Sequence, residues 1–267
     1  MSPDKLTRRA RYLRAVKRDR VIVSAARALL LVALLLLWEG AARSGLIDPF
    51  IFSAPSRIVK TTLALFQTGG LMTHILVSLW ETLLGFVLGV SLGVFFAVVM
   101  WWFPRVGKVL DPYLVILNSL PKIALGPVLI VWMGTGMTAI VTIAVLVSVV
   151  VAISGIYSGF LEVSEAKITL MRSFGASRWQ ILTMVVLPAN VPTIITALKL
   201  SVGMSWVGVI VGEFLISRAG LGYLIVYGGQ VFKLDIVMAS VTILCALAGG
   251  MYFLVALLER AIRRARA

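Results

Sequence analysis

Long apolar runs recur along this chain, and they constrain its fold more than any other feature. The hydrocarbon core of a bilayer is about 30 Å thick and needs roughly 20 apolar residues per helix. Six such runs follow one another, at residues 21–42, 75–102, 110–133, 139–159, 191–216 and 236–258. A backbone in lipid must satisfy its own hydrogen bonds, so each run predicts a spanning helix. With 60% hydrophobic residues, the chain is predicted to be an all-α, polytopic membrane protein.

Basic residues gather at the ends of these runs. A net charge of +14 would favour a nucleic-acid partner in a soluble protein. Here the basic residues crowd positions 1–20 and the C-terminal tail, which is typical of segments that face an anionic cytoplasmic leaflet. Smaller basic groups at 105–108 and 167–178 fall on the same predicted side. We therefore expect a membrane location with both termini in the cytoplasm and no nucleic-acid partner.

The chain divides by these signals into five parts. They are a basic cytoplasmic N-terminus (1–20), a first transmembrane helix (21–42), a periplasmic connection (43–74), a membrane core (75–260) and a basic cytoplasmic tail (261–267). Within the connection, Ala54-Pro55-Ser56 predicts a helix start with proline in the first turn.

A polar cytoplasmic segment, 160–190, lies between the fourth and fifth runs and predicts two short helices. Ser164 is a favourable N-cap residue, followed by Glu165 in the first turn. Gly175 supplies a left-handed helix end, and Ser177 with Gln180 forms a capping box for the second helix.

The first of these helices carries apolar residues at Ile168, Met171 and Phe174, which are predicted to form one exposed stripe. Two interpretations stay open. The stripe either lies on the membrane surface or on the chain's own loops, or it inserts into a groove of a partner protein.

The stretch Gly175-Ala176-Ser177-Arg178, with Val186-Leu187-Pro188 after it, resembles the coupling loop of permease subunits of binding-protein-dependent ABC importers. That loop carries Glu-Ala-Ala, three residues, glycine and an aliphatic-Leu-Pro ending. Here Thr169-Leu170-Met171 stands in the Glu-Ala-Ala place, and Glu165-Ala166 lies one turn earlier. Whether Glu165 or Thr169 replaces the usual glutamate stays open.

Further motifs resemble the branch of this family that imports sulfonates, taurine, nitrate or vitamin precursors. They are Ser78-Leu79-Trp80 with Gly85, Leu120-Pro121 with Trp132-Met133-Gly134, and Trp206 with Gly212-Glu213 and Gly220-Leu221-Gly222. Together the motifs extend over roughly residues 50–260.

The resemblance implies a type I importer fold and a permease subunit that forms the pathway for a small solute delivered by an external binding protein. It also implies a bacterial cytoplasmic (inner) membrane location, two ATPase subunits that bind ATP and Mg, and alternating access. The second permease is either another copy of this chain (a homodimer, the simpler arrangement) or a related chain. No cofactor is expected in this chain itself. The residues expected to couple to the ATPase are Glu165, Ile168, Thr169, Met171, Arg172, Phe174, Gly175, Ala176 and Arg178.

Proline and glycine interrupt the third run at Pro121 and Gly126-Pro127, and unwound backbone at membrane depth commonly lines a transport cavity. The predicted pathway residues are Asn118, Ser119, Lys122, Ser205, Trp206 and Glu213. Pairing of intramembrane charges, such as Glu81 with Lys122, is the alternative explanation of these polar groups, and Lys199 can extend toward the cytoplasm.

Glycines at four-residue spacing allow helices to approach closely in lipid. Gly85, Gly89 and Gly93 are expected to pack within the chain, whereas Gly208 and Gly212 are predicted to lie at the subunit interface.

No phosphate-binding loop, zinc-protease motif, nucleophile elbow or dinucleotide fingerprint occurs in the sequence, so we expect no catalytic residues. The single cysteine and the single histidine do not predict a metal site. A secondary transporter or channel driven by an ion gradient remains the main alternative, and a membrane-embedded enzyme or a structural membrane subunit are others.

Overall fold

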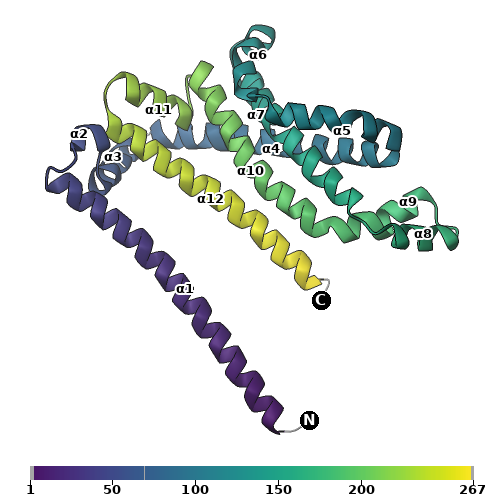
Figure 1. Ribbon diagram of the computed structural model, residues 1–267. Coiled ribbons are helices and arrows are strands. Elements are labelled where there is room, and N and C mark those ends of the chain that lie inside the picture. The colour runs from purple at the N-terminus through teal and green to yellow at the C-terminus, as the bar shows by residue number, and fades with distance from the viewer. Residues whose placement is uncertain (1–2, 69, 266–267) are drawn as a thin grey trace.

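The computed structural model describes residues 3–68 and 70–265, which fold into helices joined by short connections. The first helix, α1 (Pro3–Arg43), contacts α2 (Pro49–Phe52) and α3 (Pro55–Gln67) and otherwise lies apart from the bundle (Figure 1). Its apolar part, Val21–Arg43, has none of its most apolar window buried in the chain. Residues 1, 2, 266 and 267 of the two predicted basic ends lie outside the described residues.

Three long helices form the centre of the bundle: α4 (Gly70–Trp102), α7 (Met137–Leu161) and α10 (Leu187–Ile216). The middle one, α7, packs on both α4 and α10. Gly85 of α4 faces Ala144 of α7, and a β-carbon at Gly85 would lie only 2.6 Å from that of Ala144. Gly89 and Gly93 meet α7 one and two turns further along, so this glycine repeat packs within the chain, as expected.

The third apolar run is bent sharply. It forms α5 (Pro104–Ser119), then a 3₁₀ turn η1 (Lys122–Leu125) that continues into α6 (Gly126–Met133). The chain bends by 87° between α5 and the part formed by η1 and α6. Leu120 precedes Pro121 and has extended backbone, because the proline ring excludes the helical conformation from the residue before it. The predicted interruption at Pro121 is confirmed. At Gly126-Pro127 the chain does not leave the helix, because α6 begins there directly after η1. The described residues thus contain five long apolar helices, or up to six spans if the bent pair is one of them.

The fifth apolar run begins earlier than predicted. The helix α9 (Arg178–Ile181), the π-helical turn η2 (Leu182–Val186) and α10 follow one another without an intervening loop, as one helical run from Arg178 to Ile216. The cytoplasmic segment was predicted to extend to residue 190, and Pro188 would then lie at its end. Instead it lies in the first turn of α10, where a proline is tolerated, directly after the wider turn η2.

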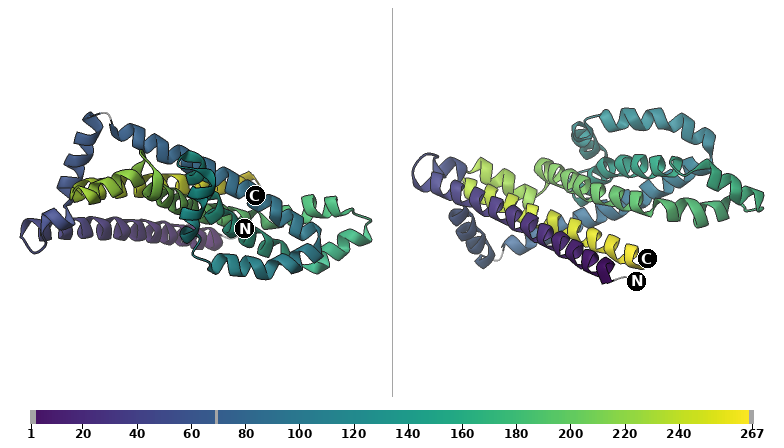
Figure 2. Two further views of the ribbon diagram at one scale, coloured as in Figure 1. Left: turned by 90° about the horizontal axis from the view of Figure 1, so that it is seen from above. Right: turned by 60° about the horizontal axis from the view of Figure 1, so that its bottom comes forward.

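The remaining elements define two ends of the molecule. α2, α3 and α11 (Leu221–Gln230) lie at one end, called the α11 end here, and α8 (Glu165–Ser173) and α9 lie at the other, the α8 end (Figures 1 and 2). The last helix, α12 (Leu234–Ala265), starts at the α11 end, where Asp235 forms a 2.7 Å salt bridge with Arg57 and accepts a 2.7 Å hydrogen bond from Ser53 Oγ.

Candidate functional site

The α8–α9 segment is stiffened by the backbone features that its sequence predicts. Gly175 has φ +75°, so glycine closes the turn between the two helices without strain. Ser177 Oγ accepts from the backbone N–H of Gln180, whose side chain accepts from the N–H of Ser177 at 2.8 Å, which confirms the capping box. Ser164 is the N-cap residue of α8, as expected, but its side chain makes no capping hydrogen bond.

The inner face of this segment packs on the bundle. Ile168, Met171 and Ala176 are half-buried against an apolar cluster that includes Ile181 and Leu182. The predicted stripe of Ile168, Met171 and Phe174 on one exposed face is therefore wrong, because two of its three side chains point inward. The alternative considered was that the stripe lies on the membrane surface or on the chain's own loops, whereas those two residues pack on the chain's own helices.

The outer face carries a different apolar pair. Phe174 is 78% exposed and Leu170, one turn before it, is 55% exposed. Glu165 and Thr169 are also exposed on α8. Leu170 was absent from our predicted coupling residues, although its spacing of four residues from Phe174 places the two on one helix face.

The two predicted arginines of the segment face α4 and α5. Arg172 and Arg178 both line a pocket beside Lys108, and Arg178 donates a 3.1 Å hydrogen bond to the backbone carbonyl of Trp102. Trp179 also leans toward Trp102, with 6.4 Å between ring centroids. This side of the segment is thus attached to the junction of α4 and α5.

At the α11 end, Glu213 anchors the loop that leads into α11. Its carboxylate accepts hydrogen bonds from Ser78 Oγ and from the backbone N–H of Gly222, both at 2.5 Å. Ser78 Oγ in turn accepts from the N–H of Leu221 at 2.7 Å. Glu213 is 1% exposed, so these bonds form in a buried site.

His74, one turn before Ser78 on α4, extends this network. Its Nδ1 accepts from the backbone N–H of Gly220 at 2.9 Å, and its ring stacks on Tyr223 of α11 with 5.7 Å between centroids. Three successive backbone N–H groups, at Gly220, Leu221 and Gly222, are therefore satisfied by side chains of α4 and α10. The network fastens α11 onto the bundle.

The predicted pathway residues separate into two groups. Asn118, Ser119 and Lys122 lie together at the break between α5 and η1, the first two exposed and Lys122 half-buried, and Asn118 Nδ2 donates to Ser154 Oγ of α7 at 2.8 Å. Ser205 and Trp206 are buried inside the bundle with Glu213. Trp206 packs among Val202, Met251 and apolar side chains of α4 and α12, so in this conformation it belongs to the core.

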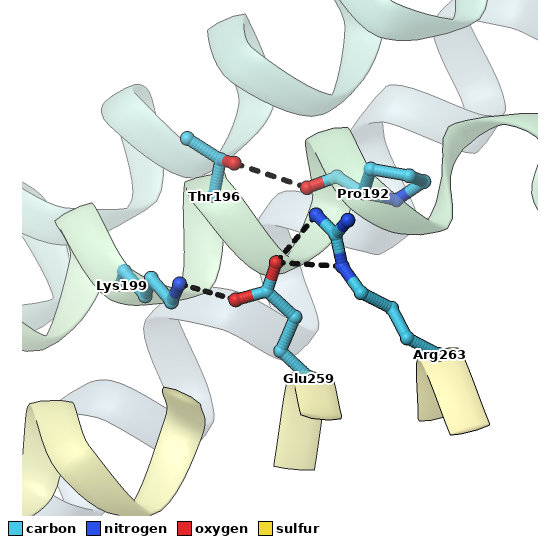
Figure 3. A network of polar contacts seen from close by, with 5 residues as sticks. All are labelled: Pro192, Thr196, Lys199, Glu259 and Arg263. Carbon is cyan, nitrogen blue, oxygen red and sulfur yellow. Dashed lines mark hydrogen bonds and ion pairs between the residues drawn. The ribbon is translucent and has the colours of Figure 1, made fainter. Parts of the chain in front are cut away.

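Pairing of charges in the apolar helices is found for Lys199, but not for the example pair Glu81 and Lys122. Glu81 lies beside Glu213, whereas Lys122 Nζ reaches the backbone carbonyl of Asn118 at 3.5 Å, so Glu81 and Lys122 are not paired. Lys199 forms a 2.5 Å ion pair with Glu259 of α12 instead of extending freely, and Glu259 also binds Arg263 at 2.7 Å (Figure 3).

The two glycines predicted at a subunit interface are buried within the chain. A β-carbon at Gly208 would lie 2.5 Å from Cα of Ala144, and one at Gly212 would lie 3.0 Å from the Ile140 side chain. Both glycines therefore serve the contact of α10 with α7. The prediction is wrong for this reason: the small residues allow close approach, but the approaching helix belongs to the same chain.

The sequence is similar to curated permease proteins over most of its length. It is 30% identical over 226 residues to a probable ABC transporter permease protein of Haemophilus influenzae, covering 84% of this chain and 91% of that protein. It is 29% identical to a taurine transport system permease protein of Escherichia coli (88% and 86% covered), and 28% identical to a putative aliphatic sulfonates transport permease protein of Bacillus subtilis (89% and 86% covered).

Solved structures share the fold. A bacterial ABC transporter involved in alginate import matches with a TM-score of 0.64 at 16% identity, covering 94% of this chain and 99% of that one. An amino acid ABC transporter matches with a TM-score of 0.61 at 19% identity, covering 74% and 96%. Residues 89–264 match the family model described as the binding-protein-dependent transport system inner membrane component. The α8–α9 segment, the bundle and the α11 network all lie largely within that matched region, and the chain belongs to this family of importer permeases.

Proposed function

We propose that this chain, with a second copy of itself, forms the translocation pathway of an ATP-driven importer, and that the ATPase subunits bind it at the α8–α9 segment. The observation that carries the proposal is the exposed pair Leu170 and Phe174 on α8, a helix whose Ile168 and Met171 pack on the bundle. A large apolar side chain that a stable helix holds away from the chain's own core is typical of a contact with a partner.

The connection between this segment and the bundle supports a coupling role. α9 leads through η2 directly into α10, which contacts α4, α7, α11 and α12. A partner that displaces the segment would therefore act on the helix that holds Glu213 at the opposite end. ATP and Mg would be bound by the partner subunits, and this chain would contribute no catalytic residue.

The orientation follows from charge. The basic residues of α8 and α9 and those near the chain ends favour the cytoplasm, which places the α8 end inside and the α11 end toward an extracytoplasmic binding protein. The similarity to permeases named for taurine, aliphatic sulfonates and formylaminopyrimidine supports a small polar solute as the substrate class. Asn118, Ser119 and Lys122 are our candidates for its pathway, because they are polar and lie at a break in the third apolar run, where Asn118 and Ser119 are exposed and Lys122 is half-buried.

The test is co-purification of the ATPase subunits with a tagged chain expressed with its partner genes. Because truncation of a buried interface anchor costs roughly 2 kcal/mol or more, we expect Phe174→Ala to lower ATPase recovery by about tenfold or more. Leu170→Ala is expected to have a smaller effect in the same direction. Phe103→Ala is the matched control, since Phe103 is also an exposed aromatic residue at the α8 end but lies outside the segment.

Equal ATPase recovery with Phe174→Ala, Leu170→Ala and the double variant would overturn the proposed contact. Recovery of the wild-type chain without any ATPase, together with uptake that follows an ion gradient, would favour the secondary transporter instead.

A further inference from the structure

A pocket of about 370 Å³ lies between the junction of α4 and α5 on one side and the α8–α9 segment on the other. Five helices line the pocket, because the end of α7 also contributes residues to it. The lining residues are Met100, Trp101, Trp102, Pro104, Lys108, Asp111, Tyr157, Leu161, Ile168, Arg172, Arg178 and Ile181.

The charged side chains of this pocket are mostly basic. Lys108 from α5 and Arg172 and Arg178 from α8 and α9 face Asp111, so positive charges outnumber the negative one by two. The hydrogen bond from Arg178 to the Trp102 carbonyl fixes one side of the pocket. Neither Lys108 nor Arg172 forms an ion pair among the described residues, so both are available to an anion.

The rest of the lining is apolar and lies where two apolar helices end. Trp101 and Trp102 close α4, and Leu161 closes α7. Tryptophan concentrates at the level of lipid headgroups, and long apolar helices end there as well. The pocket thus combines an apolar wall, an aromatic border and basic groups at the depth of the headgroups.

We propose that this pocket binds the phosphate of an anionic phospholipid of the cytoplasmic leaflet, with the phosphate at Lys108 and Arg172 and the glycerol and upper acyl chains along Trp101, Leu161 and Ile168. The leaflet is set by the orientation given under Proposed function. A free anion would find the same basic groups but would leave the apolar wall uncovered, so a lipid fits the pocket better. The bound phosphate would connect α5 with α8 and hold the segment on the bundle.

Native mass spectrometry of the purified full-length chain tests this without any ATPase, so its outcome is independent of the coupling contact. The chain is prepared in mixed micelles containing either phosphatidylglycerol or phosphatidylcholine, and retained lipid is counted. We expect preferential retention of phosphatidylglycerol, and about fivefold weaker retention in Lys108→Gln, since one basic group near a headgroup is removed.

Two variants and one competitor complete the experiment. Lys108→Arg should retain the lipid, and so should Arg105→Gln, which removes a basic residue of the same helix that faces a different hollow. Equal retention of both lipids by the wild-type chain, or equal losses in Lys108→Gln and Arg105→Gln, would overturn the proposal. Complete displacement of the lipid by millimolar inorganic phosphate would also overturn it, because the site would then be one for a free anion.

Discussion

The two ends of this molecule are stabilised differently. At the α11 end, polar side chains of α4 and α10 satisfy three successive backbone N–H groups within the chain. At the α8 end, the segment packs through half-buried apolar side chains and leaves Phe174 and Leu170 uncovered. The comparison indicates that the chain by itself specifies the position of α11, whereas the α8 end leaves apolar surface exposed where we propose that the ATPase binds.

The largest stability effect is expected at the α11 end. Glu213→Ala would leave Ser78 Oγ and the Gly222 N–H without their buried acceptor, and each unpaired group costs about 1–3 kcal/mol. Thermal unfolding of the chain in detergent should therefore occur at a clearly lower temperature. Glu213→Gln is the control, with a smaller loss because the amide fills the same space. Unchanged unfolding together with lost uptake would instead assign Glu213 to the pathway. It would also show that the buried network does not stabilise the α11 end.

A second prediction concerns the contact between α10 and α7, midway between the ends. Gly208→Ala should destabilise the chain by about 1–3 kcal/mol, because its β-carbon would overlap the backbone of Ala144. Gly203→Ala, on the same helix, meets nothing within 4 Å and should unfold like the wild type or slightly later. If Gly208→Ala unfolded normally but the two-copy assembly dissociated, as judged by light scattering, the interface prediction would be restored.

The ion network of Figure 3 is expected to contribute less. Lys199→Met would leave Glu259 paired only with Arg263, in a region where both Lys199 and Glu259 are about one-fifth exposed. We expect a loss of about 1 kcal/mol in the free energy of unfolding, with Lys199→Arg close to wild type. A loss as large as that of Glu213→Ala would show that an ion pair outside the α11 end stabilises the chain as strongly as the buried network does.

The smallest effect is predicted for the link between α3 and α12. Arg57→Gln removes a partly exposed salt bridge to Asp235 and should cost about 0.5 kcal/mol, less at high salt. Lys60→Gln, on the same helix, serves as the control and should be neutral. A large effect of Arg57→Gln that resists salt would mean that the α11 end depends on this ion pair as well as on its buried network.

Features set by local chemistry could be predicted from the sequence. The apolar runs, the break at Pro121, the left-handed Gly175 and the capping box at Ser177 depend on neighbouring residues alone, and the structure contains all of them. Features set by the approach of distant segments could not. The spacing of 168, 171 and 174 gave no indication of which helix face meets the bundle, and the partner of Glu213 lies 135 positions away in the sequence. The same limit explains Gly208 and Gly212, whose neighbour is α7.

The unbroken run from α9 to α10 also fixes the angle about the helix axis between side chains at its two ends. A helix of 39 residues is roughly 58 Å long at 1.5 Å per residue, and each residue turns the chain by about 100°. Adding or removing a single residue within η2 would therefore rotate Trp179 relative to Glu213 by more than a quarter of a circle. Because no loop separates them to absorb such a change, the length of this run must stay constant even where its apolar side chains are interchangeable.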